Sequence, residues 1–360
     1  MIENENLFNI LNKLDDAVII TDRDKKIIFQ NEHSIEIFEN DYTTQIITNL
    51  IRDPEILDSL DETIAENTTS KAEYSINRNI YDNTGGLSYE VTIYPGINDN
   101  ENNFIYIILK NISIQRNSEK IRASFVANVS HELKTPLSTI IGFIETIRTT
   151  AKNDENSKEE FLNIINDEAN RMDRLIDDLL TVSKIESNEH VHPTTKINLS
   201  KCLERIQKNL TKKLSSKNMR IQINSNMQDH HILGNEDELI QLFSNLFENS
   251  FKYGNNDSEI NVSLQKKENK DNKSLSLFKK NIIEVKIEDQ SDGIPAKHLH
   301  RLTERFFRVD KSRSKSIEGT GLGLTIVKHI LNKHRGNLLI SSTINKGSVF
   351  TIQLPEAPIS

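Results

Sequence analysis

A histidine directly followed by a carboxylate gives this chain its clearest capacity for chemistry. His131 and Glu132 stand together in the run Phe125 to Leu137, and Thr135 comes four residues after the histidine. A neighbouring carboxylate can accept the Nδ1 proton of an imidazole, which fixes the tautomer and leaves Nε2 as a nucleophile. The pattern therefore predicts a histidine that can be phosphorylated, with a hydroxyl one turn away to help remove the phosphate.

The same run must form a helix to position these side chains. At 3.6 residues per turn, Val126, Val129 and Leu133 fall on one apolar stripe. His131 then points roughly 160° away from that stripe, toward solvent. Pro136 lacks a backbone N–H, so we expect the helix to bend just after the site. A solvated surface histidine is the alternative for a His-Glu pair taken alone.

The full run resembles the phospho-acceptor box of bacterial sensor histidine kinases, in the subfamily with an acidic residue after the histidine and Thr-Pro shortly beyond. The resemblance implies that His131 takes the γ-phosphoryl group of ATP and that Glu132 activates it. It also implies that Thr135 positions a water molecule for dephosphorylating the partner protein.

The length of 360 residues predicts two or three domains, and the net charge of −8 argues against non-specific binding of nucleic acid. The single Cys202 excludes an internal disulfide and fits a reducing cytosol. No run approaches the roughly 18 apolar residues of a membrane helix, and residues 1–6 are unlike a signal peptide. We therefore expect a cytoplasmic chain that lacks a membrane anchor or was separated from one, and that could associate with the inner face of the plasma membrane through partners.

Residues 1–113 show an order of elements that resembles a PAS sensor domain. The pattern predicts helices near 7–14, 32–38 and 54–63, and strands near 17–22, 26–30, 71–78, 88–94 and 104–111. A photochemical flavin domain would need a reactive cysteine, and this span has none. His33 is a candidate haem ligand, although a lone histidine is more often an ordinary surface residue. A domain that only dimerises and relays strain is the alternative.

Residues 114–190 predict a helical hairpin. The first helix should end near Thr150, and Ser157 with Glu160 should form a capping box for the second. Steps of four and three residues define a heptad seam made of Phe161, Ile165, Glu168, Met172, Leu175, Leu179 and Val182. The seam needs a partner, so two hairpins are expected to form a four-helix bundle in a homodimer. Glu168 either sets the register of the seam or lies at its edge.

Residues 191–360 contain four segments that together look like the ATP-binding domain that histidine kinases share with gyrase-type and Hsp90-type ATPases; no Walker motif is present. The first segment predicts a helix over 238–253. Its inward face should consist of Leu239, Leu242, Phe243, Leu246 and Phe247. Asn245 and Asn249 share another face one turn apart, and amide oxygens suit a hard cation such as Mg²⁺.

By resemblance, Asn249 ligates the magnesium ion, and Asn245 and Glu248 support it. Lys252 and Tyr253 would contact the nucleotide. A polar patch at a helix end is the alternative for this group of residues.

The second segment surrounds Asp289, a carboxylate at a strand end that can accept a hydrogen bond from the adenine amino group. Asp289 holds that role in the family, and Gly293 lets the backbone approach the base. The family normally has a glycine where this chain has Ser291. A serine there should narrow the pocket or strain the turn, which puts the affinity for ATP in doubt.

The third segment, residues 304–311, supplies cations, and the fourth supplies glycines. Arg308 or Lys311 could meet the γ-phosphate, and Phe306 and Phe307 would pack a lid hinge. A short amphipathic helix with a basic face is the alternative for this segment. Gly319, Gly321 and Gly323 lead into a helix expected from 325 to 333. They free backbone N–H groups to surround phosphates.

Five motifs in the family's order predict a multidomain α+β protein with a PAS-like sensor at 1–113, a dimerisation and phosphotransfer hairpin at 114–190 and a GHKL-type α/β sandwich at 191–360. The resemblance implies an ATP- and Mg²⁺-dependent protein histidine kinase. It would pass phosphate to an aspartate on the receiver domain of a response regulator, and regulator phosphatase activity is a further hypothesis.

The stretches 142–147 and 171–180 are particularly like phosphate-regulon sensor kinases, which implies a membrane transporter or sensory complex as partner. Two other classes remain open: a scaffold that binds ATP without transferring phosphate, which Ser291 favours, and an ATPase doing conformational work.

Overall fold

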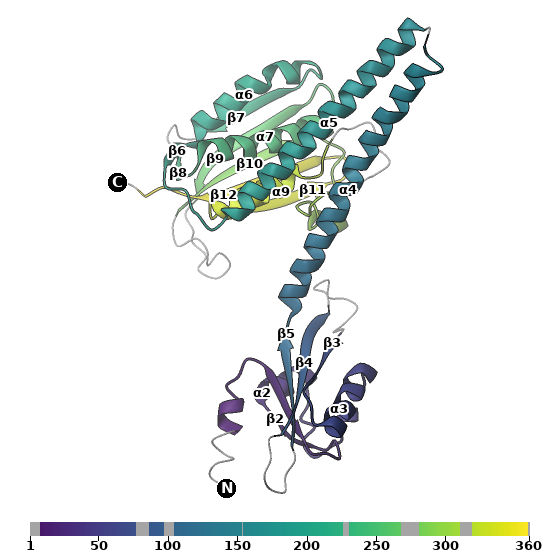
Figure 1. The fold of residues 1–360 in the computed structure, drawn as a ribbon. Helices are drawn as coiled ribbons and strands as arrows, with labels where there is room; N and C mark the ends of the chain where they lie inside the picture. Colours follow the sequence, from purple (N-terminus) through teal and green to yellow (C-terminus); the bar gives the residue numbers. More distant parts are fainter. Residues whose placement is uncertain are drawn as a thin grey trace. The chain divides into compact units, whose positions relative to one another are not determined.

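The chain folds into two units. The computed structural model describes residues 8–76, 86–96, 104–152, 154–225, 230–267, 281–309 and 319–358. The units comprise residues 1–127 and 128–360, and each is built around a hydrophobic core of its own. Figure 1 shows the elements of both units. None of the helices in these described ranges combines the length and the apolar character that a bilayer crossing requires.

The first unit is an antiparallel sheet in the order β2-β1-β5-β4-β3. Its strands are β1 Ala17–Thr21, β2 Ile27–Gln30, β3 Ser70–Ile76, β4 Leu87–Pro95 and β5 Ile105–Asn111, and its helices are α2 Glu32–Phe38, a 3₁₀ turn Ile47–Asn49 and α3 Pro54–Glu66. The expected order of two strands, short helices and three strands is confirmed. All five residues of β1 are buried, which places this strand in the middle of the core.

Local capping explains where the helices of this unit begin. The side chain of Asn31 accepts from the N–H of Ser34 at 2.9 Å and caps α2. The carboxylate of Asp53 accepts from the N–H of Glu55 and caps α3, whose first residue is Pro54. His33, the candidate haem ligand, lies partly exposed on α2 with its Nδ1 3.3 Å from Glu36. That contact is typical of an ordinary surface histidine.

Two long helices form the hairpin. Helix α4 spans Ser113–Arg148 and continues through the buried Pro136, and α5 spans Glu155–Ser187. The expected capping box at Ser157 is wrong: α5 begins earlier, with Asp154 as its N-cap. The carboxylate of Asp154 accepts from both the N–H and the hydroxyl of Ser157, so the serine serves inside the first turn as a donor.

The heptad seam of α5 packs partly within this chain. The ring of Phe161 lies 5.1 Å from the ring of Phe143 on α4, and Leu175 is buried. Val182 belongs to the core that α5 shares with the C-terminal sandwich, so the expectation that the whole seam awaits a partner chain is wrong at this end.

The rest of the second unit is a sandwich of helices on a five-stranded sheet in the order β11-β12-β10-β9-β7, in which only the β7–β9 pair is parallel. The strands are β7 Arg220–Ser225, β9 Glu259–Lys267, β10 Ile282–Asp289, β11 Asn337–Thr343 and β12 Gly347–Pro355. The helices are α6 Leu199–Ser215, α7 Glu236–Tyr253, a short α8 Ala296–Leu299 and α9 Gly323–Lys333. A two-stranded sheet pairs β6 Lys196–Asn198 with β8 His231–Leu233.

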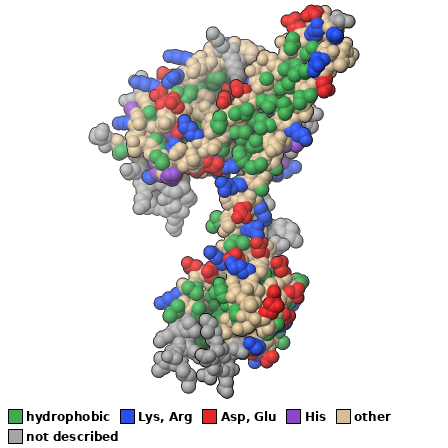
Figure 2. All heavy atoms as spheres, viewed as in Figure 1, with side chains coloured by type: hydrophobic (Ala, Val, Ile, Leu, Met, Phe, Trp, Pro, Cys, Tyr) green, Lys and Arg blue, Asp and Glu red, His purple; other side chains and the backbone are tan. Residues whose placement is uncertain are grey.

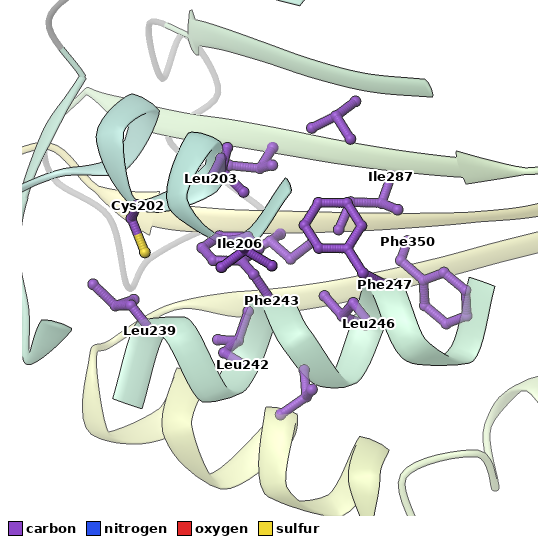
Figure 3. Close-up of a cluster of buried hydrophobic side chains, with 14 of the residues drawn as sticks. Cys202, Leu203, Ile206, Leu239, Leu242, Phe243, Leu246, Phe247, Ile287 and Phe350 are labelled. Atoms are coloured by element: carbon purple, nitrogen blue, oxygen red, sulfur yellow. The ribbon is translucent and has the colours of Figure 1, made fainter. Parts of the chain in front are cut away.

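Helices α6, α7 and α9 bury their apolar faces against one face of this sheet. Alternate residues of β9 and β10, such as Val262 and Val285, are fully buried in that core. The inward face expected for α7 is confirmed, since all five of its residues have no exposed surface. Figure 3 shows them with Cys202 of α6 and Phe350 of β12. This core fixes the direction in which the opposite side of α7 presents its asparagines.

Candidate active site

The predicted phospho-acceptor lies on the surface. His131 is exposed on α4, in the second unit. The hydroxyl of Thr135 donates to the carbonyl oxygen of His131 at 3.2 Å, so its side chain is on the same side of the helix as the histidine's backbone carbonyl. The imidazole is therefore accessible to a nucleotide or to another protein.

Glu132 makes its ion pair across the hairpin. Its Oε2 lies 3.8 Å from the guanidinium of Arg171 on α5, and both side chains are about one-third exposed. Within the described residues, no hydrogen bond joins Glu132 to the imidazole of His131. The role predicted for Glu132 therefore requires its carboxylate to turn from α5 toward the histidine.

The two asparagines of α7 face the glycine-rich segment, residues 319–323, which runs into the start of α9. Both Asn245 and Asn249 are half-buried, and the amide of Asn245 donates to the carbonyl of Gly323 at 3.4 Å. A Cβ at Gly323 would lie 3.8 Å from the Asn245 amide carbon, so the two segments meet closely. Amide oxygens are hard donors of the kind that fits a magnesium ion, so the residues present here are compatible with one.

The end of α7 carries the other residues predicted to contact nucleotide. Lys252 is half-buried with its Nζ 3.8 Å from Glu248, one turn earlier. Tyr253 is 49% exposed, which leaves the ring free to cover a ligand. Both residues follow Asn249 on the same helix, so one rigid element positions all of them.

Asp289 is the last residue of β10 and is buried. Its carboxylate accepts from the N–H of Ser348 at 3.1 Å and from the hydroxyl of Ser250 at 3.5 Å. Burial raises the pKa of Asp289, and hydrogen bonds from Ser291, Ser348 and Ser250 oppose that rise. Sequence reasoning missed these serines, although the pairing of a final strand with β10 places Ser348 opposite Asp289.

The turn after β10 does not carry the strain expected at Ser291, since its backbone is not among the described positive-φ positions. The Ser291 hydroxyl accepts from the N–H of Gly293 at 3.3 Å and so stabilises the turn. Gly293 itself has a φ of +75°, and a Cβ there would lie 2.2 Å from the carbonyl oxygen of Thr343. Only glycine suits this position.

Replacing Gly293 with alanine should destabilise the second unit by about 1–3 kcal/mol, through left-handed strain and the overlap with Thr343. Thermal unfolding checks this, and nucleotide affinity should fall as well because the turn directly follows Asp289. The matched control is Gly142→Ala, since a Cβ on this helical glycine meets nothing within 4 Å and should stabilise by about 0.5–1 kcal/mol. An unchanged melting temperature for Gly293→Ala would contradict the assignment.

The third predicted segment contacts the fourth. A guanidinium nitrogen of Arg308 donates to the carbonyl of Gly319 at 2.8 Å, and the N–H of Phe306 donates to Gly321. Residues 304–308 are not helical, which removes the amphipathic-helix alternative. Gly321 has a φ of +72° and lies against the backbone of Phe306. Lys311 lies outside the described residues.

The glycine-rich segment also touches the hairpin. The hydroxyl of Thr320 donates to the carboxylate of Asp178 on α5 at 2.6 Å, and burial raises the pKa of Asp178. Arg305 pairs with Glu186 of α5 nearby. Sequence reasoning had no signal for these contacts, since they join residues far apart in the chain.

Taken together, these elements define a class of protein: a helical hairpin with an exposed histidine, joined to a GHKL-type nucleotide-binding sandwich. Residues 121–188 match the family described as the His Kinase A (phospho-acceptor) domain, and residues 234–358 match the histidine kinase-, DNA gyrase B- and HSP90-like ATPase family.

The chain is 32% identical to the phosphate regulon sensor protein PhoR of Pseudomonas aeruginosa, over 96% of this chain and 73% of that protein. It is 26% identical to the sensor histidine kinase WalK of Bacillus subtilis, over 98% of this chain and 56% of that protein. The fold resembles that of the histidine kinase ThkA, solved in complex with the response regulator protein TrrA, with a TM-score of 0.52, 18% identity and coverage of 97% and 98% of the two chains. The chain belongs to the two-component sensor histidine kinases, which are ATP-dependent phosphotransferases.

Proposed function

We propose that this kinase phosphorylates His131 from ATP bound between α7, the turn after β10 and the glycine-rich segment. The observation that carries the proposal is the exposed imidazole beside a carboxylate, in the same unit as the nucleotide sandwich. Nε2 attacks the γ-phosphorus in line, and the bond to the β–γ bridging oxygen breaks as ADP leaves. Glu132 accepts the Nδ1 proton, so the imidazole need not carry a full positive charge.

The residues around the nucleotide supply binding and charge. Asn249, supported by Asn245, would hold a magnesium ion, which when bound neutralises the phosphate oxygens. Asp289 accepts from the amino group of the purine, and the N–H groups before α9 face the phosphates. Arg308, whose guanidinium now donates to the carbonyl of Gly319, would steady the transferring group by donating to a phosphate oxygen instead.

We also propose that the kinase works as a homodimer. Two apolar rows on the hairpin are exposed in the single chain, and Figure 2 shows apolar side chains gathered along it. The rows consist of Leu137, Ile141 and Ile144 on α4 and Leu162, Ile176 and Leu180 on α5. Heptad-like spacing in both rows suits a second hairpin packed alongside in a four-helix bundle.

The phosphate would move from His131 to an aspartate on the receiver domain of a response regulator. The similarity to PhoR supports a role in phosphate-starvation signalling, with a membrane transporter or sensory complex upstream. We place the protein in the cytoplasm, and the buried, unpaired thiol of Cys202 fits that reducing compartment.

Incubation of the purified chain with γ-labelled ATP tests the kinase proposal. A label on protein that is lost in acid and stable in base identifies phosphohistidine. Nucleotide binding without any label would support a scaffold, and released phosphate without label would support an ATPase. Either result would end the proposal.

Thr135→Ala should slow dephosphorylation of the phosphorylated regulator by at least about tenfold, because the hydroxyl that positions water is lost. Autophosphorylation should persist, since within the described part of the chain the hydroxyl donates to the carbonyl of His131 and forms no hydrogen bond with the imidazole. The matched control is Thr139→Ala, which removes an equivalent hydroxyl bond one turn later. Loss of regulator phosphate is followed over time on gels; unchanged dephosphorylation in Thr135→Ala would remove this activity from the proposal.

A further inference from the structure

Arg171 on α5 lies between two carboxylates. One guanidinium nitrogen is 3.8 Å from Oε2 of Glu132, and the other terminal nitrogen is 3.7 Å from Oε2 of Glu168. Both distances exceed those of hydrogen bonds. The guanidinium therefore attracts two acids without a formed hydrogen bond to either.

The second acid has the stronger need for a donor. Oε2 of Glu168 is shielded from solvent and accepts no hydrogen bond from any described residue. A shielded carboxylate oxygen without a donor is costly, whereas a guanidinium can give one carboxylate two parallel hydrogen bonds. A small movement of Arg171 toward Glu168 would remove that cost and weaken its hold on Glu132.

The glycine-rich segment limits the other partners available to Glu132. Gly319 and Thr320 line a cavity of about 10 Å³ together with Glu132 and Arg171. Such a space holds about one water molecule. On this side Glu132 therefore meets the guanidinium and about one water molecule, while about a third of its side chain faces solvent elsewhere.

We propose that Arg171 is a positioning residue for phosphoryl transfer, holding Glu132 toward α5 until Glu168 draws the guanidinium away. Glu132 can then turn to Nδ1 of His131, one residue earlier on α4. This inference rests on the proposed function of His131. It also assigns a purpose to Glu168, the polar break in the heptad seam.

Three variants separate positioning from simple support of the hairpin. Arg171→Gln releases Glu132 and should raise the initial rate of autophosphorylation roughly two- to fivefold, the size expected for a partly exposed ion pair. Glu168→Gln removes the competing acid and should lower the rate by a similar factor. The double variant should behave like Arg171→Gln. Loss of mere structural support would lower the rate in both single variants, and that result would overturn the proposal.

NMR of the His131 ring nitrogens, in the full chain without nucleotide, reports the imidazole tautomer and gives a measurement independent of kinase activity. A released Glu132 should increase the share of the Nδ1–H tautomer in Arg171→Gln, because a carboxylate that accepts from Nδ1 stabilises that tautomer. The same substitution made on a Glu132→Gln background should leave the tautomer share nearly unchanged. A shift that persists on this background would mean that charge removal alone is responsible, and would refute the positioning role.

Lys134→Gln is the matched control, since it removes an exposed cation three residues after His131 that forms no ion pair with Glu132 among the described contacts. It should change neither the rate nor the tautomer share in the manner of Arg171→Gln. Should Arg171→Gln fail to fold, Arg171→Met carries the same comparison, because it removes the charge and keeps an aliphatic stem of similar length. Absence of His131 label in the unaltered chain would instead fail the kinase proposal and leave the tautomer result standing.

Discussion

Replacing His131 with alanine should abolish the acid-labile, base-stable label that the chain acquires from γ-labelled ATP. His131 is exposed and directly precedes Glu132, the arrangement that the proposed phospho-acceptor role requires. Removing the group that forms the covalent intermediate eliminates the reaction instead of slowing it, since the intermediate cannot form. The measurement is the radioactivity retained on protein after alkaline gel electrophoresis.

The variant should still bind nucleotide, because within the described residues the His131 imidazole forms no hydrogen bond or ion pair with α7, Asp289 or the glycine-rich segment. His33→Ala is the control, since it removes a partly exposed histidine that pairs only with Glu36 among the described contacts. Retained label in His131→Ala would show that another residue receives the phosphate.

Changing Asp289 to asparagine should weaken ATP binding by about tenfold to a hundredfold, because a hydrogen bond to a charged acceptor contributes about 1.5–3 kcal/mol. The buried carboxylate lies at the end of β10 with Ser348 and Ser250 as donors, and a purine amino group would be a further donor. An asparagine oxygen can still accept from Ser348 but is no longer charged. Titration calorimetry with a non-hydrolysable ATP analogue gives the affinity.

The folding stability of Asp289→Asn should not fall in parallel. Because burial raises the pKa of Asp289, the protonated carboxyl contributes to folding stability at low pH, and this contribution is lost as pH rises through the folded-state pKa. At neutral pH the charged carboxylate therefore costs folding free energy, and a neutral amide removes that cost. Glu288→Gln is the matched control, since the neighbouring carboxylate on the same strand is exposed and on the other face of the sheet. Equal losses of affinity in both variants would contradict the role of Asp289.

Local patterns in the sequence were enough to predict the elements that carry the site. The 3.6-residue period of α7 identified its buried face, and that face determines where Asn245 and Asn249 point. Strand β12 spans Gly347–Pro355, where a glycine and a proline bound an alternating run of the kind that predicts a strand.

Two local predictions were wrong, at the N-cap of α5 and at the Ser291 turn. Asp154 and Ser157 are both good N-caps, and the earlier one prevails because its carboxylate satisfies two donors of the serine. Ser291 departs from the family's glycine without a left-handed backbone, so a rule based on glycine overstated the strain.

Contacts between distant segments could not be predicted from one sequence. The ion pair of Glu132 with Arg171 depends on the register of α4 against α5, and the bond of Thr320 to Asp178 joins residues 142 positions apart. Periodicity reports which face of a helix is apolar, but not which opposing side chain will lie beside each polar group.

The buried cysteine of α6 makes this kinase convenient for spectroscopy. Burial raises the pKa of Cys202 to about 12, so at neutral pH only about one thiol in a hundred thousand is a thiolate. The chain holds no second cysteine. Maleimide dyes or spin labels should therefore react selectively with one engineered surface thiol on α5 and another on α9, leaving the native residue in place. Distances between such probes would then report, in solution, when the nucleotide sandwich leaves the hairpin.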